Sequence, residues 1–67
     1  MDTIPRQTVL DALVNIADDD ARQDAQAIIR TLPENAEENA VRAALDRSRV
    51  AQYTDAILRE IKEIMSE

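Results

Sequence analysis

The segment from Ala44 to Leu58, ALDRSRVAQYTDAIL, decides how this chain folds. Neither Pro nor Gly interrupts it, so its local sequence allows one continuous helix. At about 100° per residue, the apolar side chains before Asp46 cluster around Val41, whereas those after Arg49 lie about 180° away. The apolar side therefore changes within the segment. Either the helix breaks between Asp46 and Arg49, or one long helix is covered by different partners along its length.

Of these two arrangements we predict the long helix. Neither Pro nor Gly occurs from Ala36 to Glu67, and a helix of about 30 residues would be about 45 Å long. Two preceding helices of about 20 Å each cannot cover it, so its second half would expose an apolar stripe that a second copy can bury. The residues predicted for this self-association have the spacing of a short coiled coil. They are Val50, Thr54, Ile57, Leu58, Ile61, Ile64 and Met65.

The first half of the chain predicts an antiparallel helical hairpin over residues 5–32. Its first helix is expected from Pro5 to Ala17, because Pro is favoured in the first turn and apolar residues follow at helical spacing. The run Asp18–Asp20 interrupts that pattern and supplies an N-cap and first-turn carboxylates for the second helix. Pro33 closes the second helix, since it disfavours helical geometry at the residue before it.

The start of the third helix is predicted at Asn35, its N-cap. Glu38 follows three residues later, which is the spacing of a capping box. Two pairs, Glu38 with Arg42 and Asp55 with Arg59, have the favourable i,i+4 order along one helix. The predicted fold is therefore a single all-α domain of residues 1–67, a short antiparallel hairpin plus a long third helix that dimerises through its C-terminal half. The predicted core is Ile4, Val9, Leu10, Leu13, Val14, Ile28, Ile29, Leu32, Val41 and Leu45.

The composition excludes several classes of function. The 67 residues include no Cys and no His, which removes disulfides, thiolate chemistry and the usual zinc sites. Fourteen acidic and eight basic residues give a net charge of −6, which repels nucleic acids and anionic membranes and favours basic partners. The N-terminus lacks a basic region followed by an apolar run, and no apolar stretch approaches the length of a membrane span, so we expect a cytoplasmic protein. We also expect no cofactor.

Catalytic and metal sites find little support in the sequence. Asp18, Asp20 and Asp24 have part of the spacing of a calcium loop, but the Gly and the final Glu of such a loop are missing. Ser48 and Ser66 are hydroxyl nucleophiles without a His or a Gly-rich turn to activate them. We therefore predict no catalytic, metal or cofactor-binding residues, and no enzyme activity.

Recognition of a partner is the function that remains. Tyr53 is the only aromatic residue, and Tyr is over-represented at interface hot spots. Arg47 and Arg49 belong to the only basic cluster, which acidic neighbours neutralise. We predict a small acidic protein-binding module, a regulator or inhibitor of a larger bacterial protein of the kind that phages and plasmids encode. The alternatives are a nucleic-acid mimic or antitoxin-like component, and a structural piece that assembles with itself.

Overall fold

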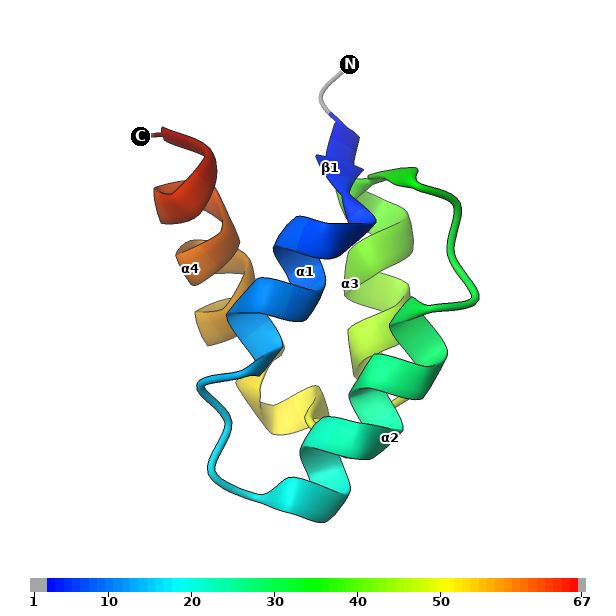
Figure 1. Cartoon of the computed structure of the whole chain (residues 1–67), viewed down its shortest axis with the longest axis vertical. Coiled ribbons are helices and arrows are strands. Elements are labelled where there is room, and N and C mark those ends of the chain that lie inside the picture. Colours follow the sequence, from blue (N-terminus) through cyan, green and yellow to red (C-terminus); the bar gives the residue numbers. More distant parts are fainter. Residues whose placement is uncertain (1–2, 67) are drawn as a thin grey trace.

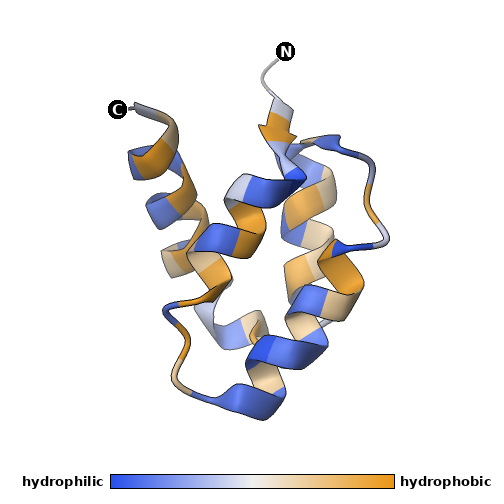
Figure 2. Ribbon diagram, viewed as in Figure 1, coloured by the Kyte–Doolittle hydropathy of each residue, from blue (hydrophilic) through white to orange (hydrophobic). Residues whose placement is uncertain are grey.

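The computed structural model describes residues 3–66, which form four helices below a short two-stranded ribbon (Figure 1). The mostly helical prediction is confirmed, and the hydrophobic positions of the helices face the centre of the molecule (Figure 2). The predicted end of the last helix at Glu67 lies outside the described residues. In chain order the elements are β1 (Thr3–Pro5), α1 (Arg6–Leu13), α2 (Asp19–Ile29), β2 (Asn35–Glu37), α3 (Glu38–Asp46), a 3-10 turn (Ala51–Tyr53) and α4 (Thr54–Ser66).

The ribbon was not predicted. β1 and β2 are antiparallel, with Ile4 opposite Ala36 at the centre and both side chains buried. Asn35, the predicted N-cap of the third helix, lies instead in β2, and α3 begins after Glu37 without a side-chain cap. The strand pairing places Asn35 opposite Pro5, two residues before the N-cap position of α3 at Glu37. The ribbon is a small addition to a fold that is otherwise helical, as predicted.

The helical hairpin is present with shorter helices than predicted. α1 ends at Leu13 rather than Ala17, and the carbonyl of Ile16 beyond it accepts a hydrogen bond from Arg22 Nη1 at 3.1 Å. The N-cap at Asp18 is confirmed, because its carboxylate accepts the backbone N–H of Ala21 at 3.2 Å. α1 and α2 pack on each other, as expected for antiparallel neighbours.

The prediction of one long third helix is wrong. α3 ends at Asp46, and the chain turns through residues 47–53 before α4 begins at Thr54. Within the turn, Ser48 Oγ donates to the carbonyl of Leu45 at 2.7 Å and accepts the N–H of Val50 at 3.2 Å. Thr54 Oγ1 also donates to a carboxylate oxygen of Asp46 at 2.9 Å. These bonds replace the helical bonds that a continuous helix would have made at this corner.

The corner returns α4 to the chain's own core. α4 packs on α1 and on α3 (Figure 1). Two ion pairs also join α3 to α4. Glu38 lies 3.5 Å from Lys62 and Arg42 lies 3.0 Å from Asp55, in place of the predicted pairs along one helix. Such exposed pairs contribute about 0–1 kcal/mol each, so burial of the apolar face holds α4 in place.

The two halves of the chain repeat the order strand, helix, helix. Ile4 and Ala36, which face each other in the ribbon, are 32 positions apart, and so are Val9 and Val41. α1 packs on α4 as α3 packs on α2, which is the pattern of two halves related by an approximate twofold axis. Six pairs of positions at this offset are buried in both halves. They are Ile4/Ala36, Val9/Val41, Ala12/Ala44, Leu13/Leu45, Ala25/Ile57 and Ile29/Ile61.

The predicted core is confirmed in its centre and wrong at Val14, which is 62% exposed. Val14 lies beyond the end of α1, so the helical spacing that placed it in the core no longer applies. Leu10, Ile28 and Leu32 are only partly buried and pack against the edge of the core. The residues that the prediction omitted are mostly small or belong to the last helix. They are Ala12, Ala21, Ala25, Ala36, Ala44, Val50, Ile57, Leu58 and Ile61.

We predict that Ser48→Ala destabilises the chain, because Ser48 is buried and its hydroxyl bonds two backbone groups of the corner. The substitution leaves the buried N–H of Val50 without its acceptor, at a cost of about 1–3 kcal/mol in the free energy of unfolding. Ser66→Ala is the matched control, since its hydroxyl also donates to a helical carbonyl at 2.7 Å but is exposed. Urea denaturation followed by circular dichroism measures both; equal losses would contradict the structural role of Ser48.

Candidate partner-binding surface

The residues predicted for self-association do not form a surface of the folded chain. Five of them, Val50, Thr54, Ile57, Leu58 and Ile61, are at most 5% exposed and belong to the chain's own core. The seam predicted for the dimer is therefore not available in this fold, because these side chains are already covered. Ile64 and Met65 remain 36% and 45% exposed at the end of α4. Self-association itself stays a prediction, without the apolar stripe that motivated it.

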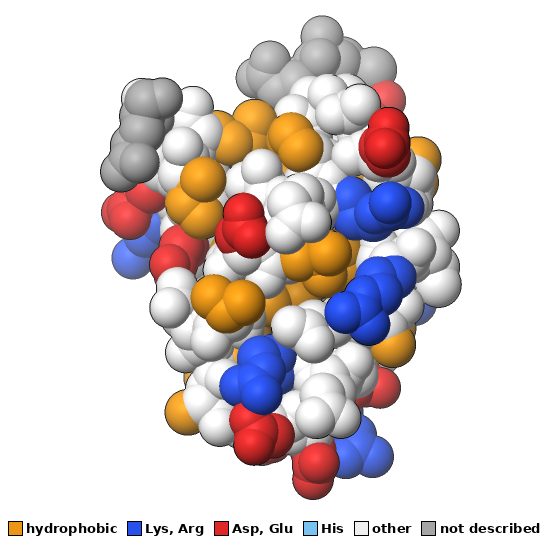
Figure 3. Space-filling view, viewed as in Figure 1, with side chains coloured by type: hydrophobic (Ala, Val, Ile, Leu, Met, Phe, Trp, Pro, Cys, Tyr) orange, Lys and Arg blue, Asp and Glu red, His pale blue; other side chains and the backbone are white. Residues whose placement is uncertain are grey.

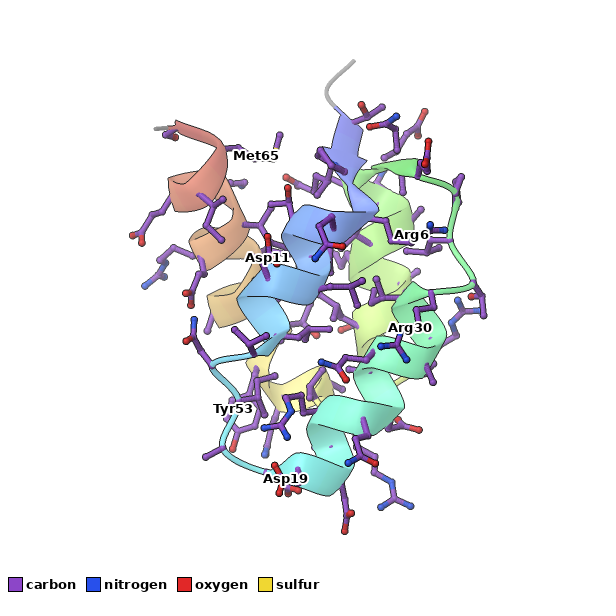
Figure 4. The ribbon with its side chains drawn as sticks, viewed as in Figure 1. Arg6, Asp11, Asp19, Arg30, Tyr53 and Met65 are labelled. Carbon is purple, nitrogen blue, oxygen red and sulfur yellow. The ribbon has the colours of Figure 1, made fainter. Side chains whose placement is uncertain are left out.

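The three residues predicted for partner binding lie on two different sides of the corner. Arg47 and Arg49 are exposed, and Arg47 lines a shallow hollow beside α2 with Ala27, Ile28 and Thr31. Tyr53, which is 46% exposed, faces the other side, where α1 ends (Figure 4). The fold therefore separates Tyr53 from the arginines, although they are close in sequence.

Tyr53 forms one wall of a groove of about 440 Å³ between the end of α1, the α1–α2 loop and the start of α4. Six of the nine lining residues are apolar. The groove, which we call the Tyr53 groove, is lined by Ala12, Asn15, Ile16, Ala17, Asp18, Tyr53, Ala56, Ile57 and Glu60. Ala12 and Ile57 are buried and form its floor, whereas Ala17, Tyr53 and Ala56 are exposed at its edges.

Two polar contacts hold the α1–α2 loop, which forms one side of the Tyr53 groove. Asn15 Nδ2 donates to a carboxylate oxygen of Glu60, which ties the α1–α2 loop to α4. On the other side of the loop, Arg22 Nη1 donates to the carbonyl of Ile16. Half-buried Ile16 packs against the edge of the core between these two contacts. These contacts fasten the loop to α4 and to α2.

The charge of the groove is negative. Its lining includes the carboxylates of Asp18 and Glu60 and no Lys or Arg. Asp19 and Asp20 follow in the exposed first turn of α2. The nearby cation of Arg22 is engaged by Asp19, in an ion pair, and by a backbone carbonyl. In the view of Figure 4, Tyr53 and Asp19 both lie toward the lower end of the molecule, whereas Arg6 and Arg30 lie higher and to the right.

The second half of the chain provides an internal comparison for this groove. At an offset of 32, Ile16 and Ala17 correspond to Ser48 and Arg49, and Ala56 corresponds to Asp24. Asp24 Oδ2 accepts the backbone N–H of Arg49 at 2.9 Å and so joins α2 to that corner. Ala56, at the position that corresponds to Asp24, has no side-chain oxygen to accept such a bond. No equivalent contact therefore joins α4 to the α1–α2 loop at Ala56. The fold thus accepts polar residues where the Tyr53 groove has apolar ones.

The other exposed apolar side chains are scattered. In the view of Figure 3, hydrophobic side chains reach the surface in separate places between charged ones. A second groove of about 630 Å³ lies between β1 and the end of α4, where Met65 forms part of its wall. It is lined by Thr3, Ile4, Glu38, Ile61, Lys62, Met65 and Ser66, a set with one residue of each charge.

Two of the three carboxylates considered as cation ligands, those of Asp18 and Asp24, accept backbone hydrogen bonds. Asp18 accepts the N–H of Ala21, and Asp24 accepts the N–H of Arg49. Residues 3–66 bring no three His, Cys, Asp or Glu side chains together as a metal site. Over the same residues, none of the helices has both the length and the hydropathy needed to cross a membrane.

Comparisons of this chain with protein-family models, with curated proteins and with solved structures find no match. The sequence prediction named Tyr53 as a candidate, and the structure places it in the Tyr53 groove together with Ile16, Ala17 and Ala56, which the prediction did not name. The available signal was the comparison of the two halves, in which V-x-x-A-L recurs at Val9–Leu13 and Val41–Leu45 and the following residues differ in polarity.

Proposed function

We propose that this chain is a non-catalytic protein-binding module that regulates or inhibits a larger protein through the Tyr53 groove. The observation that supports the proposal is the position of the single aromatic residue, 46% exposed at the edge of an apolar groove. Aromatic side chains in such positions contribute large contact area at a small cost in conformational entropy. A bacterial source, of the phage or plasmid type, remains part of this proposal.

The internal comparison argues against a purely structural reason for the groove. Corresponding positions of the other half are Ser48, Arg49 and Asp24, so burial within the chain does not require apolar side chains there. The groove thus exposes apolar side chains at positions where the other half of the fold has polar ones. Such exposed apolar side chains are typical of an interaction site. The acidic lining favours a partner with a basic surface, in agreement with the net charge of −6.

The test is affinity capture from a bacterial lysate with three immobilised proteins: the wild type, Tyr53→Ser and Met65→Ser. Met65 is the matched control because it is 45% exposed, against 46% for Tyr53, and lines the other groove. We expect one stoichiometric partner, with at least about tenfold less of it on Tyr53→Ser, as for an interface hot spot. Met65→Ser should capture it as the wild type does.

Three other results would contradict the proposal. Equal capture by all three proteins would place binding elsewhere on the surface. Capture of only the chain itself would favour a structural assembly piece. Capture of a DNA-processing enzyme that competing DNA displaces, independently of Tyr53, would favour a nucleic-acid mimic.

A further inference from the structure

We infer that the Tyr53 groove binds a cationic amphipathic α-helix of its partner, an inference that rests on the protein-binding function proposed above. The helix would place two apolar anchors about one turn apart against Ala17, Tyr53 and Ala56. Its Lys or Arg side chains would lie next to the carboxylates of Asp18 and Glu60. This is the helix-in-groove mode of recognition, in which side chains at i and i+4 fill an apolar depression.

The secondary structure around the groove favours a helix over an extended peptide. The walls are the end of α1, the α1–α2 loop and the start of α4, so no strand edge borders the groove. The only paired strands of the described residues, β1 and β2, lie at the opposite end of the molecule from the 3-10 turn (Figure 1). An added strand would therefore have no backbone ladder to extend, and binding must come from side chains.

The size of the lining side chains is also suited to a helix. Ala12, Ala17 and Ala56 are small residues contributed by three segments of the chain. Small side chains at a contact allow the axes of packed helices to approach closely, near the lower end of the usual separation of about 8–10 Å. Tyr53 stands at the edge of this depression, where its ring can cover one side of the bound helix.

Charge selects a cationic helix. Asp18 and Glu60 line the groove, and Asp19 and Asp20 extend the acidic surface along the first turn of α2. These carboxylates attract cations over about 8 Å at physiological ionic strength, which speeds encounter and disfavours acidic segments. A second copy of this chain fits less well, because it carries the same net charge of −6.

A synthetic peptide tests this inference without knowledge of the partner. The probe is a 15-residue peptide of Leu and Lys with one apolar helical face and no aromatic residue. Tyr53 is the only aromatic residue of the chain, so its ring resonances in a proton NMR spectrum report directly on the groove. We expect these resonances to shift and saturate on titration. Calorimetry should give a dissociation constant about tenfold weaker for Tyr53→Ser and unchanged for Met65→Ser.

Two further variants separate charge from shape. Glu60→Gln keeps the acceptor for Asn15 but removes one charge, so affinity and its dependence on salt should both decrease. A peptide with the same composition but a central Pro cannot form the helix and should bind at least about tenfold more weakly.

The inference is wrong if the peptide with Pro, a scrambled peptide or a Glu-for-Lys peptide binds as tightly as the probe. It is also wrong if Met65→Ser weakens binding as much as Tyr53→Ser. If a natural partner is captured through Tyr53 while the probe fails to bind, the helix is wrong but the protein-binding function stands. If Tyr53 affects neither experiment, both proposals fail.

Discussion

Ile61→Asp is expected to unfold the chain. Ile61 is fully buried between α4 and the rest of the core, and the described residues around it offer no cation within the core to pair with a carboxylate. An unpaired charge in such a place costs several kcal/mol, which is comparable to the total of about 3–5 kcal/mol that a core of this size supplies. Far-ultraviolet circular dichroism should show loss of helix at room temperature.

The matched control is Ile64→Asp, one turn further along α4. Ile64 is 36% exposed, so a carboxylate there stays hydrated and the free energy of unfolding should change by less than about 1 kcal/mol. The pair of variants also distinguishes two folds. If α4 were half of a long dimerising helix, Ile61→Asp would give folded monomers from a dimer; sedimentation of a folded, monomeric variant would contradict the arrangement described above.

Leu13→Ala and Leu45→Ala are expected to have large and similar effects. The two residues occupy corresponding positions of the two halves, and neither is exposed. Removing three carbon atoms from a packed core loses burial and leaves a cavity, at a cost of about 2–5 kcal/mol. Urea denaturation should show midpoints that fall by similar amounts. Leu10→Ala, at a partly buried position, should lose less.

A strongly unequal pair of losses would contradict the proposed equivalence of the two halves. For example, Leu13→Ala could unfold the chain while Leu45→Ala lowers the free energy of unfolding only slightly. This result would mean that α3 contributes much less to the core than α1. Equal losses would support a core assembled from two similar strand-helix-helix units.

The error about the third helix came from a correct observation. The apolar face does change sides between Val41 and Ile57, and a helix that long could not be covered by the hairpin. The sequence allows two solutions, a second copy or a corner, because Asp46–Arg49 has neither Pro nor Gly to force a break. Ser48 provides the corner through hydrogen bonds to Leu45 and Val50, and these depend on the position of α4 in the core.

The chain contains no Gly, and the corner between α3 and α4 forms without a left-handed residue. No residue among 3–66 has a positive φ, so the chain turns entirely through right-handed and extended conformations. Arg47 and Val50, for example, have φ values of −84° and −96°. A break without a left-handed residue carries no strong local signal, which is why periodicity alone could not place it.

The sequence by itself determined the helical class, the N-cap at Asp18, the acidic surface and the central core residues Val9, Leu13 and Leu45. These depend on composition and on spacing within one segment, which are local properties. Only the tertiary structure decided the ribbon, the corner at Ser48 and the Tyr53 groove. Each depends on contacts between segments far apart in the chain, such as Ile4 with Ala36 and Asn15 with Glu60. The energy of such contacts comes from shared burial and pairing, which no single segment encodes.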